Sequence, residues 1–267
     1  YGEVQGTGFE TIDLRFDACL TGHGRVERLW SGARWLEGPV WFAAGRYLLI
    51  SDIPNNRLLR WDDTDDSMSV FRRPSNYCNG NTIDQQGRLI TCEHLTRRVT
   101  RTEHDGSIRV LADEFNGKKL NSPNDVVVKR DGSIWFSDPL YGLLNDYEGG
   151  RQPSEQPPAL YRLDPSSGQI DAVATDFDGP NGLAFSPDEQ LLFVAESGAP
   201  GVPEPRQYIR RFQVNGDGRS LSGGEIFHKI SPGWADGFRV DEHGNLWSEM
   251  CVIPHLFHMI QGARVLR

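Results

Sequence analysis

Short runs of alternating apolar and polar residues recur along most of this chain, and Gly, Asn or Asp residues separate them. The clearest run is 179–198, where residues 183–185 and 191–195 have the composition of two strands and residues 186–188 that of a tight turn. This stretch therefore predicts a β-hairpin with a polar residue, Asn181, at its entrance.

Four other segments of the chain follow the same pattern. In each of them a polar residue stands eight positions before a Gly that begins the second strand, and in the hairpin at 179–198 the eighth position is Glu189. The five equivalent polar residues are Glu37, Asn79, Asn124, Asn181 and Asp236. Because side chains alternate between the two faces of a strand, a constant offset places all five at equivalent points of successive repeats.

The repeats begin at intervals of 42, 45, 57 and 55 residues, close to the roughly 40 to 50 residues of a β-propeller blade. Each repeat holds three or four short predicted strands, which is also typical of a blade. Two Gly- and Pro-rich insertions, at 140–158 and 200–205, lie in the longer intervals and are expected to be loops over one face. We therefore predict an all-β propeller domain over 26–249, with a separate segment at 1–25 and a tail without blade pattern at 250–267.

The composition makes nucleic acid and membranes poor candidates for partners of this chain. The 267 residues carry a net charge of −9, so they offer no basic surface for nucleic acid or an anionic membrane, and no apolar run reaches the roughly 20 residues that span a bilayer. The chain begins at Tyr1 without a charged and apolar leader, and Cys19, Cys78, Cys92 and Cys251 show no paired spacing. We therefore expect reduced thiols and a cytoplasmic location. The sequence leaves the oligomeric state open.

The five equivalent residues would converge on the channel of a propeller, because its innermost strands line that channel. Two carboxylates and three amides would then share a small space. Closely packed carboxylates repel one another unless a cation lies between them, and an all-oxygen set suits a hard divalent ion such as Ca²⁺, with Mg²⁺ or Mn²⁺ as alternatives. A single Asn-Gly or Asp-Gly pair more often marks only a turn, but turn residues would not keep one offset through five repeats.

Five motifs resemble, in order, those of the gluconolactonase and regucalcin (senescence marker protein) family of six-bladed propellers. They are EGPVW at 37–41, CNGNT at 78–82, NSPNDV at 121–126, GPNGLAFS at 179–186 and ADGFRVD at 235–241. The similarity covers about residues 26–249, so it includes every repeat.

This resemblance implies one divalent cation held by Glu37, Asn181 and Asp236, with Ca²⁺ expected first and Mg²⁺, Mn²⁺ or Zn²⁺ as alternatives. It also implies that Asp236 serves as general acid and base, and that Asn124 and Asn79 bind the substrate. One member of the family has Arg two residues before the equivalent of Asn124, where this chain has Ser122. A substrate contact is therefore expected to be lost or altered.

The reaction that the resemblance implies is the hydrolysis of a sugar lactone, such as a gluconolactone, to the aldonic acid. The cation would polarise the ring carbonyl while Asp236 takes the proton of the attacking water. Two other functions stay open. One is a non-catalytic propeller that binds calcium or serves as an interaction platform, and the other is a propeller esterase that acts on aryl esters or organophosphates.

A six-bladed ring needs a complete fifth blade and a sixth, about 40 residues each, but only 31 residues follow Asp236. We therefore expect the fifth blade to be incomplete and the sixth to be largely missing. Unpaired strand edges would then be exposed, and we expect the chain to be marginally stable, prone to aggregation and poorly active.

Three further groups of residues are predicted to have structural roles only. His94 follows the second predicted strand of its repeat and is expected at the surface. A cationic group is expected at a solvated strand edge; it consists of Arg97, Arg98 and Arg101. The tryptophans of the predicted inner strands are expected in the core; they are Trp41, Trp135 and Trp247.

Overall fold

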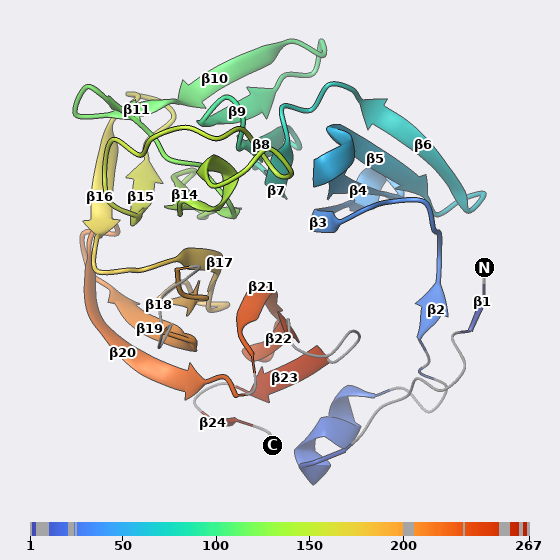
Figure 1. The fold of residues 1–267 in the computed structure, drawn as a ribbon. Helices are drawn as coiled ribbons and strands as arrows, with labels where there is room; N and C mark the ends of the chain where they lie inside the picture. Colours follow the sequence, from blue (N-terminus) through green and yellow to red (C-terminus); the bar gives the residue numbers. More distant parts are fainter. Residues whose placement is uncertain are drawn as a thin grey trace.

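Five antiparallel sheets of four strands each surround a common centre in the computed structural model (Figure 1). The structure describes residues 2–3, 11–20, 24, 26–199, 206–231, 233–250, 257–261 and 264–265. Within each sheet the strands are paired in chain order, and Figure 1 shows the first strand nearest the centre and the last strand outside. The predicted all-β propeller is therefore confirmed.

The first sheet consists of β3 (Leu36–Phe42), β4 (Tyr47–Asp52), β5 (Arg57–Asp62) and β6 (Ser67–Arg72). The second consists of β7 (Cys78–Ile83), β8 (Leu89–Glu93), β9 (Arg98–Thr102) and β10 (Ile108–Ala112). The third consists of β13 (Val126–Val128), β14 (Ile134–Asp138), β15 (Ala159–Leu163) and β16 (Ile170–Ala174). The fourth consists of β17 (Pro180–Phe185), β18 (Leu191–Glu196), β19 (Tyr208–Val214) and β20 (Leu221–Lys229). The fifth consists of β21 (Ala235–Val240), β22 (Asn245–Met250), β23 (Phe257–Gln261) and β24 (Arg264–Val265).

Smaller elements lie outside these sheets. Two short ribbons pair β1 (Gly2–Glu3) with β2 (Glu27–Arg28), and β11 (Glu114–Phe115) with β12 (Lys118–Lys119). The short 3-10 helices are η1 (Leu14–Cys19), η2 (Ala43–Gly45), η3 (Ile53–Asn55) and η4 (Tyr141–Leu143). In the part of the chain that the structure describes, no helix has the length and apolar character needed to cross a membrane.

Each pair of neighbouring sheets shares an apolar core. Leu49 packs with Leu89 between the first two sheets, and Trp135, which is fully buried, packs with Leu192 between the third and fourth. The remaining two cores lie between the second and third sheets and between the fourth and fifth. The core of this propeller is therefore divided into layers between sheets.

Two of the three tryptophans predicted in the core are instead partly exposed. The exposed fraction is 43% for Trp41 and 36% for Trp247. Their neighbours Val40 and Leu246 belong to the cores shared with the adjacent sheets. Since side chains alternate along a strand, the two tryptophans face the opposite side, where the first and fifth sheets have no four-stranded neighbour among the described residues.

The tail of the chain differs from the expectation of an incomplete fifth blade. The structure places two strands, β23 and β24, after residue 250, and they pair with β22 and with each other. The fifth sheet therefore has four strands, although the last contains only two residues. Strand pairing uses backbone groups, so a segment without alternating side chains can extend a sheet. A sixth four-stranded sheet is absent from the described residues.

The N-terminal helix η1 packs against the fifth sheet rather than standing apart from it. The rings of Phe16 and Trp247 are 6.2 Å apart, and the Asn245 amide lies 3.9 Å from the sulfur of Cys19. Figure 1 shows η1 and the β1–β2 ribbon in the opening between the first and fifth sheets. The structure describes Cys19, Cys78 and Cys92 as free thiols, whereas Cys251 lies outside the described residues.

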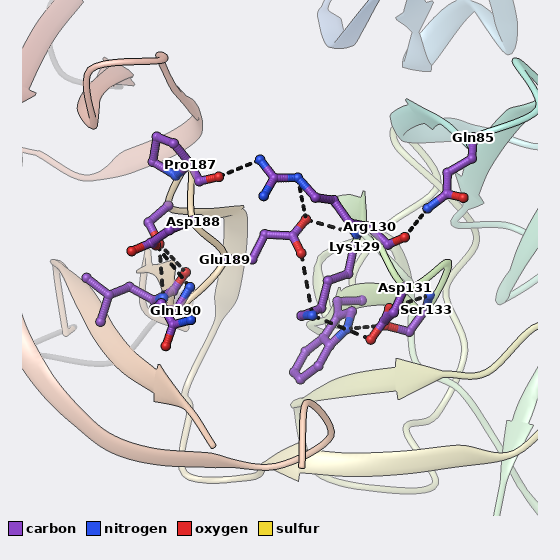
Figure 2. Close-up of polar contacts among 12 residues, drawn as sticks. Gln85, Lys129, Arg130, Asp131, Ser133, Pro187, Asp188, Glu189 and Gln190 are labelled. Carbon is purple, nitrogen blue, oxygen red and sulfur yellow. Dashed lines mark hydrogen bonds and ion pairs between the residues drawn. The ribbon is translucent and has the colours of Figure 1, made fainter. Parts of the chain in front are cut away.

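The third and fourth sheets are also joined at the hairpin turns, and Figure 2 shows this contact around Glu189. The carboxylate of Glu189 accepts a hydrogen bond from the backbone N–H of Arg130 (2.9 Å) and lies 3.4 Å from Nζ of Lys129. The guanidinium of Arg130 in turn donates to the carbonyl oxygen of Pro187 (2.6 Å). Glu189 has a φ of 58°, whereas Gly occupies the equivalent position of the neighbouring hairpins, so the contacts offset a strained backbone.

This arrangement predicts different effects for two substitutions of Glu189. Glu189→Ala loses the contacts but keeps the positive φ, and should lower the free energy of unfolding by roughly 1–2 kcal/mol. Glu189→Gly loses the same contacts but relieves the strain, so it should be more stable than the Ala variant by about 1 kcal/mol. Urea unfolding of both variants measures the difference. Equal losses would show that the backbone strain is negligible.

Candidate active site

The five equivalent polar residues lie at the beginnings of the inner strands, which are the first strands of the five sheets. In four of the five sheets the pairing register of the inner strand shifts at this point, within residues 37–40, 78–81, 180–183 and 235–238. In the third sheet Asn124 lies just before the regular strand β13. Such bulges re-aim side chains and are common beside active sites.

At three of the five positions, neighbouring inner strands approach so closely that only Gly fits after the polar residue. A Cβ atom on Gly38 would clash with the backbone oxygen of Asn79, and Gly80 meets the backbone of Asn124 in the same way. Gly182 does so with the backbone oxygen of Asp236. At these three positions, the Gly after the polar residue therefore lets the strands of two successive polar residues lie close together.

Hydrogen bonds hold these strands at this separation. The backbone N–H of Gly80 donates to the carbonyl oxygen of Asn124 (2.7 Å), and that of Leu183 donates to the carboxylate of Asp125 (3.2 Å). The hydroxyl of Ser197 donates to the carbonyl oxygen of Ala235 (2.6 Å), next to Asp236. The structure thus brings the predicted residues together as one continuous row along the inner strands.

All five side chains lie in a poorly hydrated space. The residues Asn79, Asn124, Asn181 and Asp236 are each no more than 8% exposed, and Glu37 is half-buried. Loss of hydration raises the pKa of Glu37 well above its ordinary value, and the nearby charge of Asp236 raises it further. The first and fifth sheets therefore bring two carboxylates into mutual repulsion.

Two further acids lie close enough to Asp236 to interact with its charge. Loss of hydration, and then Asp236, raise the pKa of Glu249 at the end of β22. Loss of hydration also raises the pKa of Glu148 in the insertion at 140–158, where a hydrogen bond from Asn145 opposes it and the charge of Asp236 adds to it. The candidate site is therefore a concentration of negative charge.

The residues present fit a hard divalent cation. Glu37, Asn181 and Asp236 offer carboxylate and amide oxygens, and a cation between the two carboxylates would remove their repulsion. No group of three His, Cys, Asp or Glu side chains that could hold a metal occurs among the described residues. The predicted ligands Glu37, Asn181 and Asp236 do not form such a group, because Asn181 contributes an amide oxygen.

The insertion at 140–158 forms a fixed wall beside the row. The hydroxyl of Tyr141 lies 3.1 Å from the carbonyl oxygen of Gly179 and 3.0 Å from that of Gly198, both in the fourth repeat. Ser122 accepts a hydrogen bond from the backbone N–H of Gly142 (3.0 Å) and donates to the carbonyl oxygen of Pro139 (2.7 Å). Ser122 is fully buried, so it anchors the insertion at the place where the family member has Arg.

His94 joins this wall to the row, and the prediction of a surface position was wrong. The ring is fully buried, and its Nδ1 lies 2.8 Å from the carbonyl oxygen of Glu148. A carbonyl oxygen only accepts, so Nδ1 carries the hydrogen and Nε2 accepts from the Asn79 amide, at 3.4 Å. Burial lowers the pKa of His94 to about 4. The strand pattern could not show this, because a distant insertion covers the ring.

The neutral state of His94 predicts a loss of stability in acid. The unfolded state takes up a proton near pH 6.5 and the folded state only near pH 4, so the contribution of His94 to stability falls as the pH drops through this window. The loss should approach about 3 kcal/mol. Urea unfolding of the protein and of the His94→Gln variant, from pH 7 to pH 4, measures it. His104→Gln, at an exposed histidine, is the control and should keep the pH dependence of the parent protein.

Two of the three arginines predicted at a solvated edge are buried. Arg97 is 5% exposed and donates to the carbonyl oxygen of Leu120 (2.6 Å), and Arg101 is 9% exposed and pairs with Glu103 (2.6 Å). Arg98 is half-buried and pairs with the buried carboxylate of Glu93 (2.7 Å). Charged side chains that are removed from water need such partners, and spacing alone does not reveal them.

A cavity of about 470 Å³ lies apart from the row. It is lined by hairpin residues of the second and third sheets, among them Asp84, Arg88 and Asp131. The turns at 84–88 and 129–133 come after the inner strands β7 and β13, whereas the five polar residues lie at the starts of the inner strands. The cavity and the row therefore lie at opposite ends of the inner strands. Arg88 already pairs with Asp84 (2.8 Å) and with Glu103 (3.0 Å), and the cavity shares no residue with the row.

The sequence did not predict three residues near the row, namely Trp35, Tyr147 and Glu148. Trp35 donates its indole N–H to the carboxylate of Glu37 (2.8 Å), and its ring lies 6.4 Å from that of Tyr147. Trp35 stands one residue before β3. It could have been found by extending the alternation of that strand back from Glu37 by two positions. Tyr147 and Glu148 belong to the insertion, whose path no periodicity predicts.

Comparison with known proteins identifies the family of this chain. Residues 35–259 match the family model described as the SMP-30/gluconolactonase/LRE-like region. A gluconolactonase from Zymomonas mobilis is 31% identical over 88% of this chain and 69% of its own length, and a pentonolactonase from Haloferax volcanii is 27% identical over 82% and 69%. The solved structure of a gluconolactonase from Xanthomonas campestris superposes with a TM-score of 0.83 at 38% identity, covering 92% of this chain and 79% of that one. The chain therefore belongs to the SMP-30/gluconolactonase/LRE-like family.

Proposed function

We propose that this protein hydrolyses a sugar lactone to the open aldonic acid at the row of polar residues on the inner strands. One observation carries the proposal: Glu37 and Asp236, from the first and fifth sheets, repel each other in a poorly hydrated space beside three buried amides. The gluconolactonase and pentonolactonase among the relatives of this chain support a sugar lactone as substrate.

Glu37, Asn181 and Asp236 would hold one divalent cation, with Ca²⁺ first and Mg²⁺, Mn²⁺ or Zn²⁺ as alternatives. When bound, such a cation supplies Lewis acidity that polarises a lactone carbonyl and stabilises the negative charge that develops on its oxygen. The amide of Asn181 and the two carboxylates have the chemistry for this role. The close packing at Gly182 holds the fourth and fifth sheets, which carry Asn181 and Asp236, together.

Asp236 would act as general base and then as general acid. Its carboxylate takes a proton from water as the water oxygen attacks the lactone carbonyl carbon. The bond between that carbon and the ring oxygen then breaks, and the proton passes from Asp236 to the ring oxygen, which becomes a hydroxyl group. Asn124 and Asn79 would bind substrate hydroxyls, and the contact with His94 orients the Asn79 amide for this task.

A hydrolysis panel tests the proposal against its rivals. The substrates are glucono-1,5-lactone, a pentonolactone, p-nitrophenyl acetate and an aryl phosphotriester, each assayed with chelator and after restoring Ca²⁺, Mg²⁺, Mn²⁺ or Zn²⁺. We expect ion-dependent hydrolysis of the sugar lactones with higher kcat/KM than for the other two. Preference for the aryl substrates would identify an esterase, and no hydrolysis with any ion would favour a non-catalytic propeller.

We also propose that the protein works in the cytoplasm. The thiols of Cys78 and Cys92 are buried and free, a state that a reducing compartment preserves.

A further inference from the structure

Two aromatic side chains remain partly exposed next to Glu37. The exposed fraction is 44% for Trp35 and 47% for Tyr147, and their ring centroids are 6.4 Å apart at an angle of 56°. They come from segments far apart in sequence, namely the residues before β3 and the insertion at 140–158. Large aromatic surface left in contact with water beside a polar site is typical of a place where a ligand binds.

Both aromatic residues are held in position before any ligand arrives. The carbonyl oxygen of Trp35 accepts a hydrogen bond from the backbone N–H of Ile53 (3.2 Å), and its indole N–H donates to Glu37 (2.8 Å). On the other side, the backbone N–H of Tyr147 donates to Asn145 (2.8 Å), and the next residue, Glu148, is bound by His94. A ligand that stacks on these rings beside Glu37 therefore loses little conformational entropy of the protein on binding.

The chemistry of the pair matches one face of a sugar ring. A cyclic sugar presents C–H groups on its faces and hydroxyl groups at its edge, so it needs an aromatic surface beside hydrogen-bonding groups. The indole bond to Glu37 places the aromatic surface directly beside the proposed reacting centre. The buried amides of Asn79 and Asn124 lie along the same row and can bind hydroxyl groups.

We propose that Trp35 and Tyr147 form a stacking subsite that binds the C–H face of the sugar-lactone ring and sets the preference for a cyclic sugar substrate. This inference rests on the proposed lactonase function. It assigns to Trp35 a role beyond its hydrogen bond to Glu37, and to Tyr147 a role in substrate binding.

Kinetics on glucono-1,5-lactone test the subsite. Tyr147→Ala and Trp35→Ala should each raise KM roughly tenfold, whereas Tyr147→Ala should change kcat less than twofold. Trp35→Phe keeps an aromatic face but loses the indole N–H, so its KM should stay near that of the parent protein. Trp41→Ala is the control, because Trp41 is as exposed as Trp35 (43% against 44%) but lies near the other end of β3 from Glu37. It should change neither KM nor kcat. An unchanged KM in Tyr147→Ala would overturn the proposal.

A binding measurement separates this inference from the proposed function. The probe is D-gluconolactam, a ring analogue that resists hydrolysis, observed by saturation-transfer NMR. We expect saturation of its ring C–H protons by the parent protein and by Trp41→Ala, and loss of the signal in the Trp35→Ala/Tyr147→Ala double variant. Equal signals in the parent and double variants would overturn the subsite even where lactones are hydrolysed. Aromatic-dependent binding without any hydrolysis would keep the subsite and reject the lactonase function, and neither binding nor hydrolysis would reject both.

Discussion

Replacing Asp236 by Asn should reduce the rate of lactone hydrolysis by about 10³-fold or more. The substitution keeps the size of the side chain but removes its ability to accept a proton from water, and it weakens the proposed cation site by one negative charge. Asp236 is 8% exposed in the row of inner-strand residues, so bulk water cannot readily replace it as the base. Initial rates on glucono-1,5-lactone, at saturating cation, measure the effect.

Asn124→Ala is the matched comparison, because Asn124 lies in the same row and has a similar exposure of 6%. It should raise KM for the lactone while cation binding, measured by calorimetry, stays unchanged. If both variants lose cation affinity equally, the division of roles between Asp236 and Asn124 is contradicted. Near-normal turnover by Asp236→Asn would remove the proposed mechanism altogether.

The propeller and the row of polar residues could be predicted because both follow from repetition. One offset through five repeats predicts that Glu37 and Asp236 occupy equivalent places. The arrangement of the five inner strands around one centre then brings the two carboxylates close enough to repel each other. The Gly after four of the five polar residues is part of the same signal, since Gly38, Gly80 and Gly182 each leave room for the backbone of the next strand. Local pattern and tertiary packing agree here.

Contacts made by insertions and short strands could not be predicted in this way. His94 and Ser122 are buried because the insertion at 140–158 lies over them, and its path depends on long-range contacts rather than on periodicity. The strands β23 and β24 pair through backbone groups with little side-chain pattern. Trp41 and Trp247 have the spacing of core residues. They face the side of the first and fifth sheets that has no four-stranded neighbour among the described residues.

The proposed cation should also stabilise the fold, because its ligands come from the first, fourth and fifth sheets. An ion present at 100 times its Kd contributes about 2.7 kcal/mol to the free energy of unfolding. For a chain of this size each kcal/mol shifts Tm by roughly 2–4 °C, so we expect an increase of about 5–10 °C. Thermal unfolding with Ca²⁺, Mn²⁺, Mg²⁺ and Zn²⁺, at constant ionic strength, measures the shift.

The Glu37→Gln variant shows whether such a shift arises at the predicted site. It should be no less stable than the parent protein without added ion, because it removes the repulsion between Glu37 and Asp236. It should also lose most of the ion-dependent increase in Tm. An equal increase in the variant would place the ion elsewhere on this acidic protein, and no increase in the parent protein with any of the four ions would contradict a cation that links the sheets. The readout does not depend on catalysis, so it separates cation binding by Glu37, Asn181 and Asp236 from the identity of the substrate.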